Sequence, residues 1–197
     1  MRGCAILLPA AGAATRMRGQ DKLLEHVNGQ PILRHVAQLA LTVSAHLAVS
    51  LRDPDPARQK SLEGLPLTRL CLPDASEGMA ASLRAGASWA MVLPVGALMI
   101  ALPDMPDITA QDMRALIAAQ AAHSTQALRA SDMAGRAGHP VILPRRLFAD
   151  MLQLRGDEGA RQLLRRHPPR LHPLQGKRAL TDLDTPEDWA AWRAGGH

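Results

Sequence analysis

The chain has 197 residues, of which 47% are hydrophobic and 21% charged, a composition typical of one globular domain and not of a disordered segment. Its 23 Lys and Arg against 18 Asp and Glu give a formal net charge of +5, which favours anionic ligands. Only 2% of the residues are aromatic, which leaves almost nothing to stack on bases, so we expect small phosphorylated substrates and no nucleic acid.

The first residues and the cysteines indicate the cellular context. Met1-Arg2-Gly3 leads directly into an apolar run without the pattern of a secretory signal. No apolar segment approaches the roughly 18 residues that a membrane span needs. The two cysteines, Cys4 and Cys71, lack the spacing of a zinc or thiol motif and are expected in the core. We therefore expect a cytoplasmic protein that binds no membrane.

Short apolar runs alternate with helical patterns along the chain. They predict strands at 4–9, 47–51, 67–72, 97–102, 126–130, 140–143 and 179–183. Helical spacing predicts a covering helix after Pro31, and capping patterns at Thr109 and Thr185 predict the starts of two more. The segment 52–60 is expected to be a turn and a short polar helix without chemistry, and 132–138 a mobile loop. This alternation favours an α/β fold with three layers and a mainly parallel, Rossmann-like central sheet, in one domain over residues 1–197.

The first strand opens into a loop of small residues that is typical of phosphate binding. Small side chains let backbone N–H groups approach an anion closely, and basic residues follow where phosphates would lie. The spacings GxGxxG and GxxxxGK[ST] are absent. A plain strand-to-helix turn with solvated basic residues is the alternative. The candidate residues are Ala10, Ala11, Gly12, Ala13, Arg16, Arg18 and Lys22.

Acidic residues follow two of the predicted strands. Asp104 lies between two prolines just past an apolar run, where its carboxylate could hold a hard cation such as Mg²⁺, although an aspartate in a turn more often serves as a cap. Asp182 and Asp184 precede Thr185 and Pro186, where acids are also favoured by the start of a helix without any metal. Ligands of parallel α/β sheets collect at the carboxyl ends of strands, so these acids are candidate site residues.

These motifs resemble those of the MobA-like nucleotidyltransferases, which transfer a nucleoside monophosphate from a nucleoside triphosphate. Ala-Ala-Gly, then Arg16-Met17, Gly19 and Lys22-Leu23-Leu24, is similar to the signature loop of that family, although Arg18 is interposed here before Gly19. Leu-Pro-Asp104-Met-Pro is similar to its metal-aspartate motif. The resemblance implies a nucleotidyltransferase fold whose loop wraps the triphosphate, with Lys22 at the α-phosphate and with Arg16, Lys22 and Asp104 as the catalytic group.

The same resemblance assigns further residues to the metal and the nucleotide. The segment Asp182–Asp188 is similar to the family's terminal acidic motif, which implies Mg²⁺ held by Asp104 and Asp184. Gly-Met-x-x-Ser-Leu is similar to a segment that contacts the nucleotide, which implies contacts from Gly78 and Ser82. We expect the side chains of Met79 and Leu83 to be core residues at helical spacing.

Two later motifs resemble those of the molybdenum cofactor cytidylyltransferases. They are Gly-His-Pro-Val from Gly138 and the segment Leu154–Arg161. The resemblance implies that the N-terminal half binds the nucleotide and that the C-terminal half binds the acceptor through His139, Arg155, Asp157, Glu158 and Arg161. With Pro-Ala-Ala-Gly in the first loop it implies CTP, and transfer of CMP to the phosphate of Mo-molybdopterin with release of pyrophosphate. A molybdenum hydroxylase apoenzyme or its maturation factor would be a further partner.

Three other functions remain open at the level of sequence. A related transferase could use another nucleotide or another phosphorylated acceptor. A Rossmann-type oxidoreductase that binds NAD(P) would fit the strand pattern, but the chain lacks the GxGxxG that such a site needs. A non-catalytic molybdopterin carrier would bind the pterin without releasing pyrophosphate.

Overall fold

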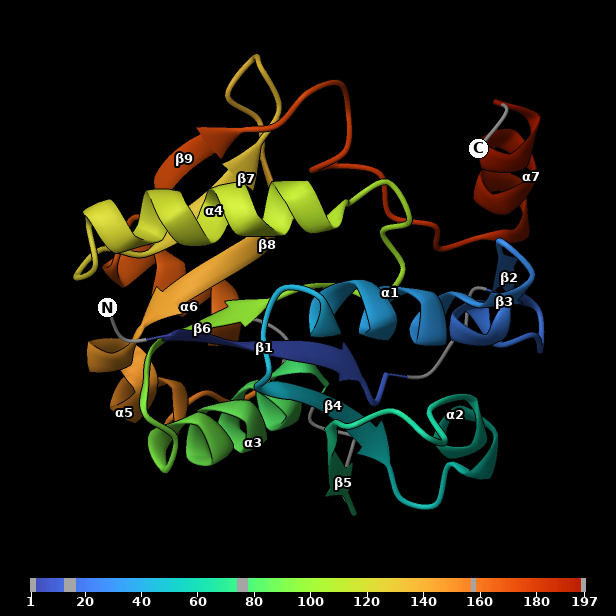
Figure 1. The fold of residues 1–197 in the computed structure, drawn as a ribbon, viewed down its shortest axis with the longest axis horizontal. Coiled ribbons are helices and arrows are strands. Elements are labelled where there is room, and N and C mark those ends of the chain that lie inside the picture. Colours follow the sequence, from blue (N-terminus) through green and yellow to red (C-terminus); the bar gives the residue numbers. More distant parts are fainter. Residues whose placement is uncertain (1–2, 13–16, 74–77, 157–158, 196–197) are drawn as a thin grey trace.

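A mainly parallel sheet runs through the whole molecule (Figure 1). The computed structural model describes residues 3–12, 17–73, 78–156 and 159–195. The strand order is β5-β4-β1-β6-β8-β7-β9, and only β8 runs antiparallel to its neighbours among these strands. The strands are β1 (Gly3–Ala10), β4 (Leu47–Arg52), β5 (Thr68–Leu72), β6 (Val95–Ile100), β7 (Leu128–Ser131), β8 (Ala137–Pro144) and β9 (Arg170–Pro173), beside a small hairpin of β2 (His26–Val27) and β3 (Gln30–Pro31).

Helices cover both faces of the sheet and complete the predicted three layers (Figure 1). One face carries α1 (Ile32–Leu41) and α4 (Ala110–Ala122), and the other carries α3 (Met79–Met91), α5 (Phe148–Met151) and α6 (Gly159–Arg166). The remaining elements are α2 (Pro56–Ser61), α7 (Pro186–Ala194) and the 3₁₀ turns η2 (Lys22–Leu24) and η3 (Arg145–Leu147). None of the described helices is long and apolar enough to cross a membrane.

The central strand β1 is apolar because it is buried on both faces. Ile6 and Leu8 belong to the hydrophobic cluster under α1 and α4, whereas Ala5 and Leu7 belong to the cluster under α3 and α5. All four side chains are inaccessible to solvent. Alternate residues of a strand point to opposite faces, so a continuous apolar run is what a central parallel strand requires. The predicted two-sided burial of this strand is confirmed.

Both predicted helix caps are present. The Thr109 hydroxyl accepts a hydrogen bond from the backbone N–H of Asp112, whose carboxylate accepts one from the N–H of Thr109. Thr185 and Asp188 form the same reciprocal pair at the start of α7, with Pro186 in the first turn. Each cap satisfies N–H groups that have no partner within the helix.

The predicted strand at 179–183 is wrong. The backbone turns there, with the N–H groups of Leu180 and Thr181 both donating to the carbonyl of Lys177. Ala179 and Leu183 are buried in the core, which explains why the segment is apolar although it joins no sheet. The additional strand is β9, which pairs in parallel with β7 at the edge of the sheet.

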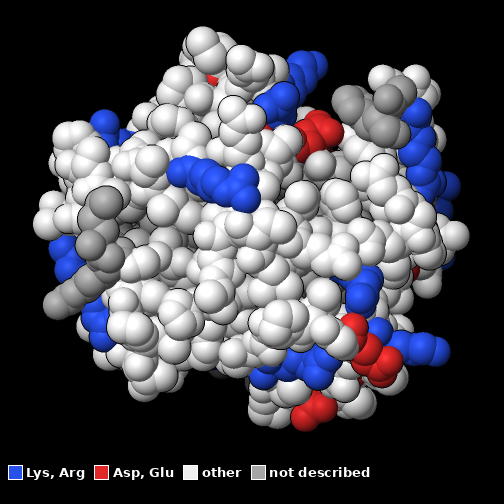
Figure 2. Space-filling model, viewed as in Figure 1, with Lys and Arg blue, Asp and Glu red and all other residues white. Residues whose placement is uncertain are grey.

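One smaller expectation also differs from the structure, and another differs only in its bounds. Cys71 is exposed in β5, the other edge strand of the sheet, whereas Cys4 in β1 is buried as predicted. Residues 132–138 include a turn organised by Asp132, whose carboxylate accepts hydrogen bonds from the N–H groups of Ala134 and Arg136, and β8 already begins at Ala137. The face of the molecule in Figure 2 shows charged side chains in separate groups, one of which contains both signs and lies over α2.

Candidate active site

The predicted phosphate loop and the predicted metal aspartate lie at one edge of the sheet. β1 and β6 pair in parallel, with Leu7 opposite Ile100, so the chain leaves both strands on the same side. Ala11 and Gly12 follow β1, Lys22 begins η2, and Asp104 follows β6. This carboxyl edge is where open α/β sheets bind ligands.

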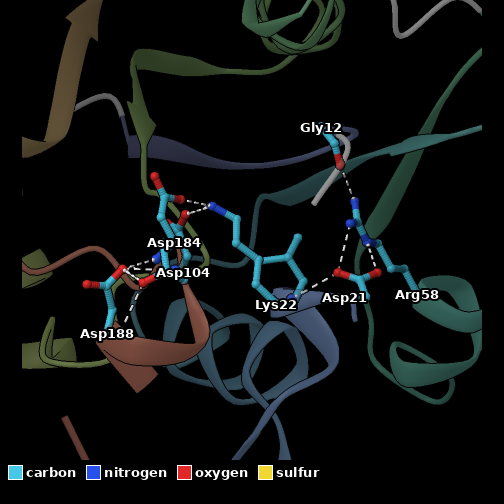
Figure 3. Close-up of polar contacts among 9 residues, drawn as sticks. Gly12, Asp21, Lys22, Arg58, Asp104, Asp184 and Asp188 are labelled. Carbon is cyan, nitrogen blue, oxygen red and sulfur yellow. Dashed lines mark hydrogen bonds and ion pairs between the residues drawn. The ribbon is translucent and has the colours of Figure 1, made fainter. Parts of the chain in front are cut away.

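Lys22 joins two carboxylates that come from distant parts of the chain (Figure 3). Its ammonium lies 2.5 Å from an oxygen of Asp104 and 2.5 Å from an oxygen of Asp184. The Leu183 N–H donates to the Asp104 carbonyl at 3.0 Å and thereby fixes the segment before α7 against the loop after β6. Burial lowers the pKa of Lys22, but the charges and hydrogen bonds of Asp104 and Asp184 outweigh burial and raise it overall. The ammonium is therefore charged at neutral pH.

The two aspartates fit a divalent cation. Asp104 is 8% exposed, and its Oδ1 is buried without a hydrogen-bond partner in the described part of the chain. A buried carboxylate oxygen without a partner is costly, and a cation would satisfy it. Mg²⁺ is usually held by one or two carboxylates together with waters and substrate phosphates. Among the described residues no group of three or more His, Cys, Asp or Glu could hold a metal.

Asp182 lies near this centre but is exposed. The pKa of its carboxyl is raised, first by partial burial and then by the negative charges of Asp184 and Asp104. Lys22 acts in the opposite direction. Asp182 therefore interacts with Asp104 and Asp184 through its charge, whereas Asp184 is the one of the two neighbouring aspartates that contacts Lys22.

Arg58 is a residue of this region that nothing in the sequence had singled out. It lies in α2, in the segment expected to carry no chemistry, and it is only 4% exposed. Its guanidinium binds the carboxylate of Asp21, the residue before Lys22, and the carbonyls of Ala10 and Gly12. The turn and the short helix predicted for 52–60 are present, and Arg58 gives this helix a contact with Asp21 that the sequence did not indicate.

A family model for the MobA-like NTP transferase domain matches residues 5–171. The chain belongs to this family. It therefore carries a nucleotidyltransferase-type domain. No curated protein sequence matches the chain.

Solved structures share the fold over nearly the whole length of the MobA-like chain. Rv0371c from Mycobacterium tuberculosis H37Rv is 26% identical, with a TM-score of 0.81 and 96% of each chain covered. A structure of Rv0371c in complex with manganese gives 24% identity, a TM-score of 0.77 and 97% coverage of each chain. A CMP:2-keto-3-deoxy-manno-octonic acid synthetase complexed with CTP is 15% identical, with a TM-score of 0.77 and 98% of each chain covered.

The residues of this MobA-like domain that were assigned to the nucleotide are only partly described. Ala13 and Arg16 lie outside the described residues. Ala10 and Ala11 are buried at the end of β1, and Gly12 is exposed. Gly78 precedes α3 with φ of 62° and ψ of −141°, a conformation that essentially only glycine adopts. Ser82 is buried in the first turn of α3, where Met79 and Leu83 pack in the core as expected.

The residues assigned to the acceptor lie partly around the first residues of β8. The His139 N–H donates to the Ala179 carbonyl at 2.9 Å, and its ring Nδ1 is buried without a hydrogen-bond partner among the described residues. Burial lowers the pKa of His139 to about 4, and the charge of Arg129 adds to this effect, while the Ile100 carbonyl opposes it. The ring is therefore neutral at pH 7.

Arg129 is a second functional candidate that the sequence did not indicate. It lies on β7, where its Nε donates to the Gly138 carbonyl at 2.7 Å. Burial lowers the pKa of Arg129, and the charge of Arg161 lowers it further. Arg129 is thus close enough to Arg161 and His139 to interact with both. Arg155 is exposed and no contact joins it to this group in the described structure, and Asp157 and Glu158 lie outside the described residues.

The interposed Arg18 is accommodated at the surface. Arg18 and Gly19 both have positive φ angles, of 51° and 93°, so the extra residue is taken up in a left-handed turn. The Arg18 guanidinium lies 2.6 Å from the carboxylate of Glu187 in α7. The ion pair is exposed and leaves Lys22 in the centre of the site.

Proposed function

We propose that this MobA-like domain transfers CMP from CTP to the terminal phosphate of Mo-molybdopterin and releases pyrophosphate. The observation that carries the transfer is the contact of Lys22 with Asp104 and Asp184 at the carboxyl edge of the sheet. An ammonium beside two carboxylates is suited to a reaction between two phosphates, where the protein stabilises charge and positions the groups.

The reaction needs no nucleophilic side chain. An oxygen of the acceptor phosphate attacks the α-phosphorus of CTP, the bond to the β-phosphate oxygen breaks, and pyrophosphate leaves with that electron pair. The attacking phosphate is already anionic near neutral pH, so no general base is required. Lys22 is long and flexible enough to pass its ammonium from the aspartates to the α-phosphate, where it would stabilise the negative charge of the transition state.

Asp104 and Asp184 are the residues that would hold the Mg²⁺ of the reaction. The cation would supply charge stabilisation for the phosphates. The Oδ1 of Asp104, which has no hydrogen-bond partner among the described residues, supports this assignment, and so does the existence of a manganese complex of Rv0371c. The choice of CTP is supported by the small-residue loop after Pro9 and by the CTP complex of a structural neighbour.

The acceptor half of the proposal rests on the basic group of Arg129, His139 and Arg161. Arg129 and Arg161 repel one another, which an anionic group placed between them would relieve. His139 lies beside them at the edge that carries Asp104. We assign this group, and Arg155 with Asp157 and Glu158, to the pterin substrate. A molybdenum hydroxylase apoenzyme would then receive the product.

The decisive experiment is incubation of the protein with Mo-molybdopterin, Mg²⁺ or Mn²⁺ and each nucleoside triphosphate in turn, followed by measurement of pyrophosphate and of the nucleotide in the product. We expect pyrophosphate and a cytosine dinucleotide with CTP. Product with GTP or ATP instead would favour the related transferase, and pterin binding without pyrophosphate would favour the carrier. The family assignment lends no support to the NAD(P)-dependent alternative.

The division into two halves has its own test. Arg129→Gln and Arg155→Ala should raise the apparent KM for molybdopterin and spare that for CTP. Arg170→Gln is the control, because Arg170 is an exposed arginine of the neighbouring strand β9. If the first two variants weakened CTP alone, the assignment of this half to the acceptor would be wrong.

A further inference from the structure

Arg58 is among the most deeply buried charged side chains that the structure describes, at 4% exposed. An arginine is rarely this inaccessible unless its charge is paired and its N–H groups are satisfied. Nε and Nη2 donate to the two carboxylate oxygens of Asp21 at 2.7 and 2.8 Å, which makes a bidentate pair. Nη1 donates to the carbonyls of Ala10 at 2.6 Å and of Gly12 at 3.0 Å. Asp55, which caps α2, lies 3.5 Å from Nε.

These contacts join the two ends of the phosphate loop. Ala10 and Gly12 lie where the loop leaves β1, and Asp21 lies where it enters η2. Asp21 also caps η2 by accepting a hydrogen bond from the Leu23 N–H at 3.0 Å. The Asp21 carboxylate is therefore held by Arg58 on one side and fixes the turn of Lys22 on the other. Figure 3 shows Lys22 between the Asp21–Arg58 pair and the two aspartates.

The carbonyl contacts also orient backbone N–H groups. In a trans peptide the C=O and the following N–H point in opposite directions. With the Ala10 carbonyl on Arg58, the N–H of Ala11 therefore points away from it. One side chain thus determines both the direction of the peptide at the start of the loop and the position of the turn that carries Lys22.

We propose that Arg58 is a positioning residue of nucleotidyl transfer, which aligns Lys22 and the start of the phosphate loop by holding Asp21, Ala10 and Gly12 together. The reaction in this statement rests on the proposed function, whereas the alignment itself does not. Arginine is required because its planar fork can bind a carboxylate in bidentate fashion and still reach two carbonyls, which a lysine ammonium cannot do.

The first test is kinetic. A misplacement of about 1 Å can cost about 100-fold in rate, so we expect Arg58→Lys to lower kcat by about 10- to 100-fold. The KM for the nucleotide should change by less than about 3-fold, because the guanidinium faces protein groups and contributes mainly to alignment in the transition state. Asp21→Asn should act in the same direction, and the double variant should be little worse than Arg58→Lys alone, because both changes break the same connection.

Arg34 provides a matched control. Its guanidinium donates to the carbonyls of Ser61 and Glu63, both at 2.9 Å, and so fastens the far end of α2 without reaching the loop. Arg34→Lys makes the same change of side chain, weakens another contact of α2, and should leave kcat unchanged. If Arg34→Lys and Arg58→Lys lowered kcat equally, Arg58 would merely stabilise α2 and the proposal would be overturned.

The second test does not depend on activity. The N–H groups of Leu23 and Leu24 both donate to Asp21, so their hydrogen exchange reports the turn that carries Lys22. We expect faster exchange there in Arg58→Lys and Asp21→Asn than in the native protein or in Arg34→Lys. If the N–H groups of Leu23 and Leu24 exchanged at the native rate in both variants, the proposed alignment would be overturned. It would also be overturned if these groups exchanged faster while the variants of an active enzyme kept the native kcat. If the native protein transferred no nucleotide, the proposed function would fail while the exchange still decided the alignment.

Discussion

Removal of the Lys22 charge should destabilise the protein in a way that acid or a divalent cation reverses. In Lys22→Met the ammonium that lies 2.5 Å from both Asp104 and Asp184 is lost, and two partly buried carboxylates face each other. Removing one partner of a buried ion pair leaves an uncompensated charge, which is more costly than the pair is stabilising.

The distances from Lys22 to the two carboxylates give the size of the expected loss in stability. Two oxygens that each lie 2.5 Å from the same nitrogen are within ~5 Å of one another, and Coulomb's law with an effective dielectric constant of about 20 gives ~3 kcal/mol of repulsion. The Asp184 side chain is 28% exposed and can turn towards water, so we expect a loss of about 2 kcal/mol in the free energy of unfolding. For a domain of this size that corresponds to a fall in Tm of about 4–8 °C.

The assay is thermal unfolding of Lys22→Met and of the native protein at pH 7 and at about pH 4, with and without Mn²⁺. Protonation of a carboxyl in acid, or a bound cation at neutral pH, removes the repulsion, so the difference in Tm should shrink in both conditions. The pKa of Lys22 is raised above its ordinary value of 10.5, so its own stabilising effect is complete at pH 7 and is lost only as the pH rises through the folded-state value.

Lys177→Met is the control, because Lys177 is exposed and is not part of the carboxylate pair. It should have nearly native Tm under all conditions. A native Tm for Lys22→Met at pH 7 would refute the electrostatic reasoning, and so would a loss that neither acid nor Mn²⁺ relieves.

Three further predictions concern other residues of the site. Asp104→Asn should fold normally but lose orders of magnitude in pyrophosphate release, and native metal-dependent turnover would remove Asp104 from the site. His139 has its pKa lowered to about 4 from 6.5, so it contributes stability above pH 6.5 that is lost as the pH falls towards 4, by ~3 kcal/mol in total. When the free energy of unfolding in urea is measured against pH, His139→Asn should make it fall less steeply between pH 6.5 and 4 than in the native protein. The same slope in both proteins would contradict the burial of a neutral ring. In Gly138→Ala the added Cβ would lie 1.8 Å from the Ala179 carbonyl oxygen, so the urea midpoint should fall by the equivalent of ~3 kcal/mol, whereas Gly3→Ala, with open space around it, should be nearly native.

The sequence by itself determined much of the local structure around the candidate site. The apolar run of β1, the capping residues Thr109 and Thr185 and the small-residue loop each carry their information within a few positions. Asp104 could be singled out because it stands in a short motif just after the buried strand β6, and Lys22 because it closes the loop motif that begins after β1. Strand burial and helix capping could be predicted because both act on neighbouring residues, whereas phosphate binding by the loop stays a prediction.

The tertiary structure alone decided which distant side chains complete the site. Arg58 is 37 positions from Asp21 and 48 from Ala10, and no local pattern distinguishes it from a solvated arginine of a short polar helix. Arg129 likewise reaches the Gly138 carbonyl and the charge of Arg161 only in the folded chain. The apolar segment at 179–183 looked like a strand because burial in a turn and burial in a sheet produce the same hydrophobic side chains. Periodicity records whether a residue is buried, whereas its partners depend on the order of the strands and the packing of the helices between them.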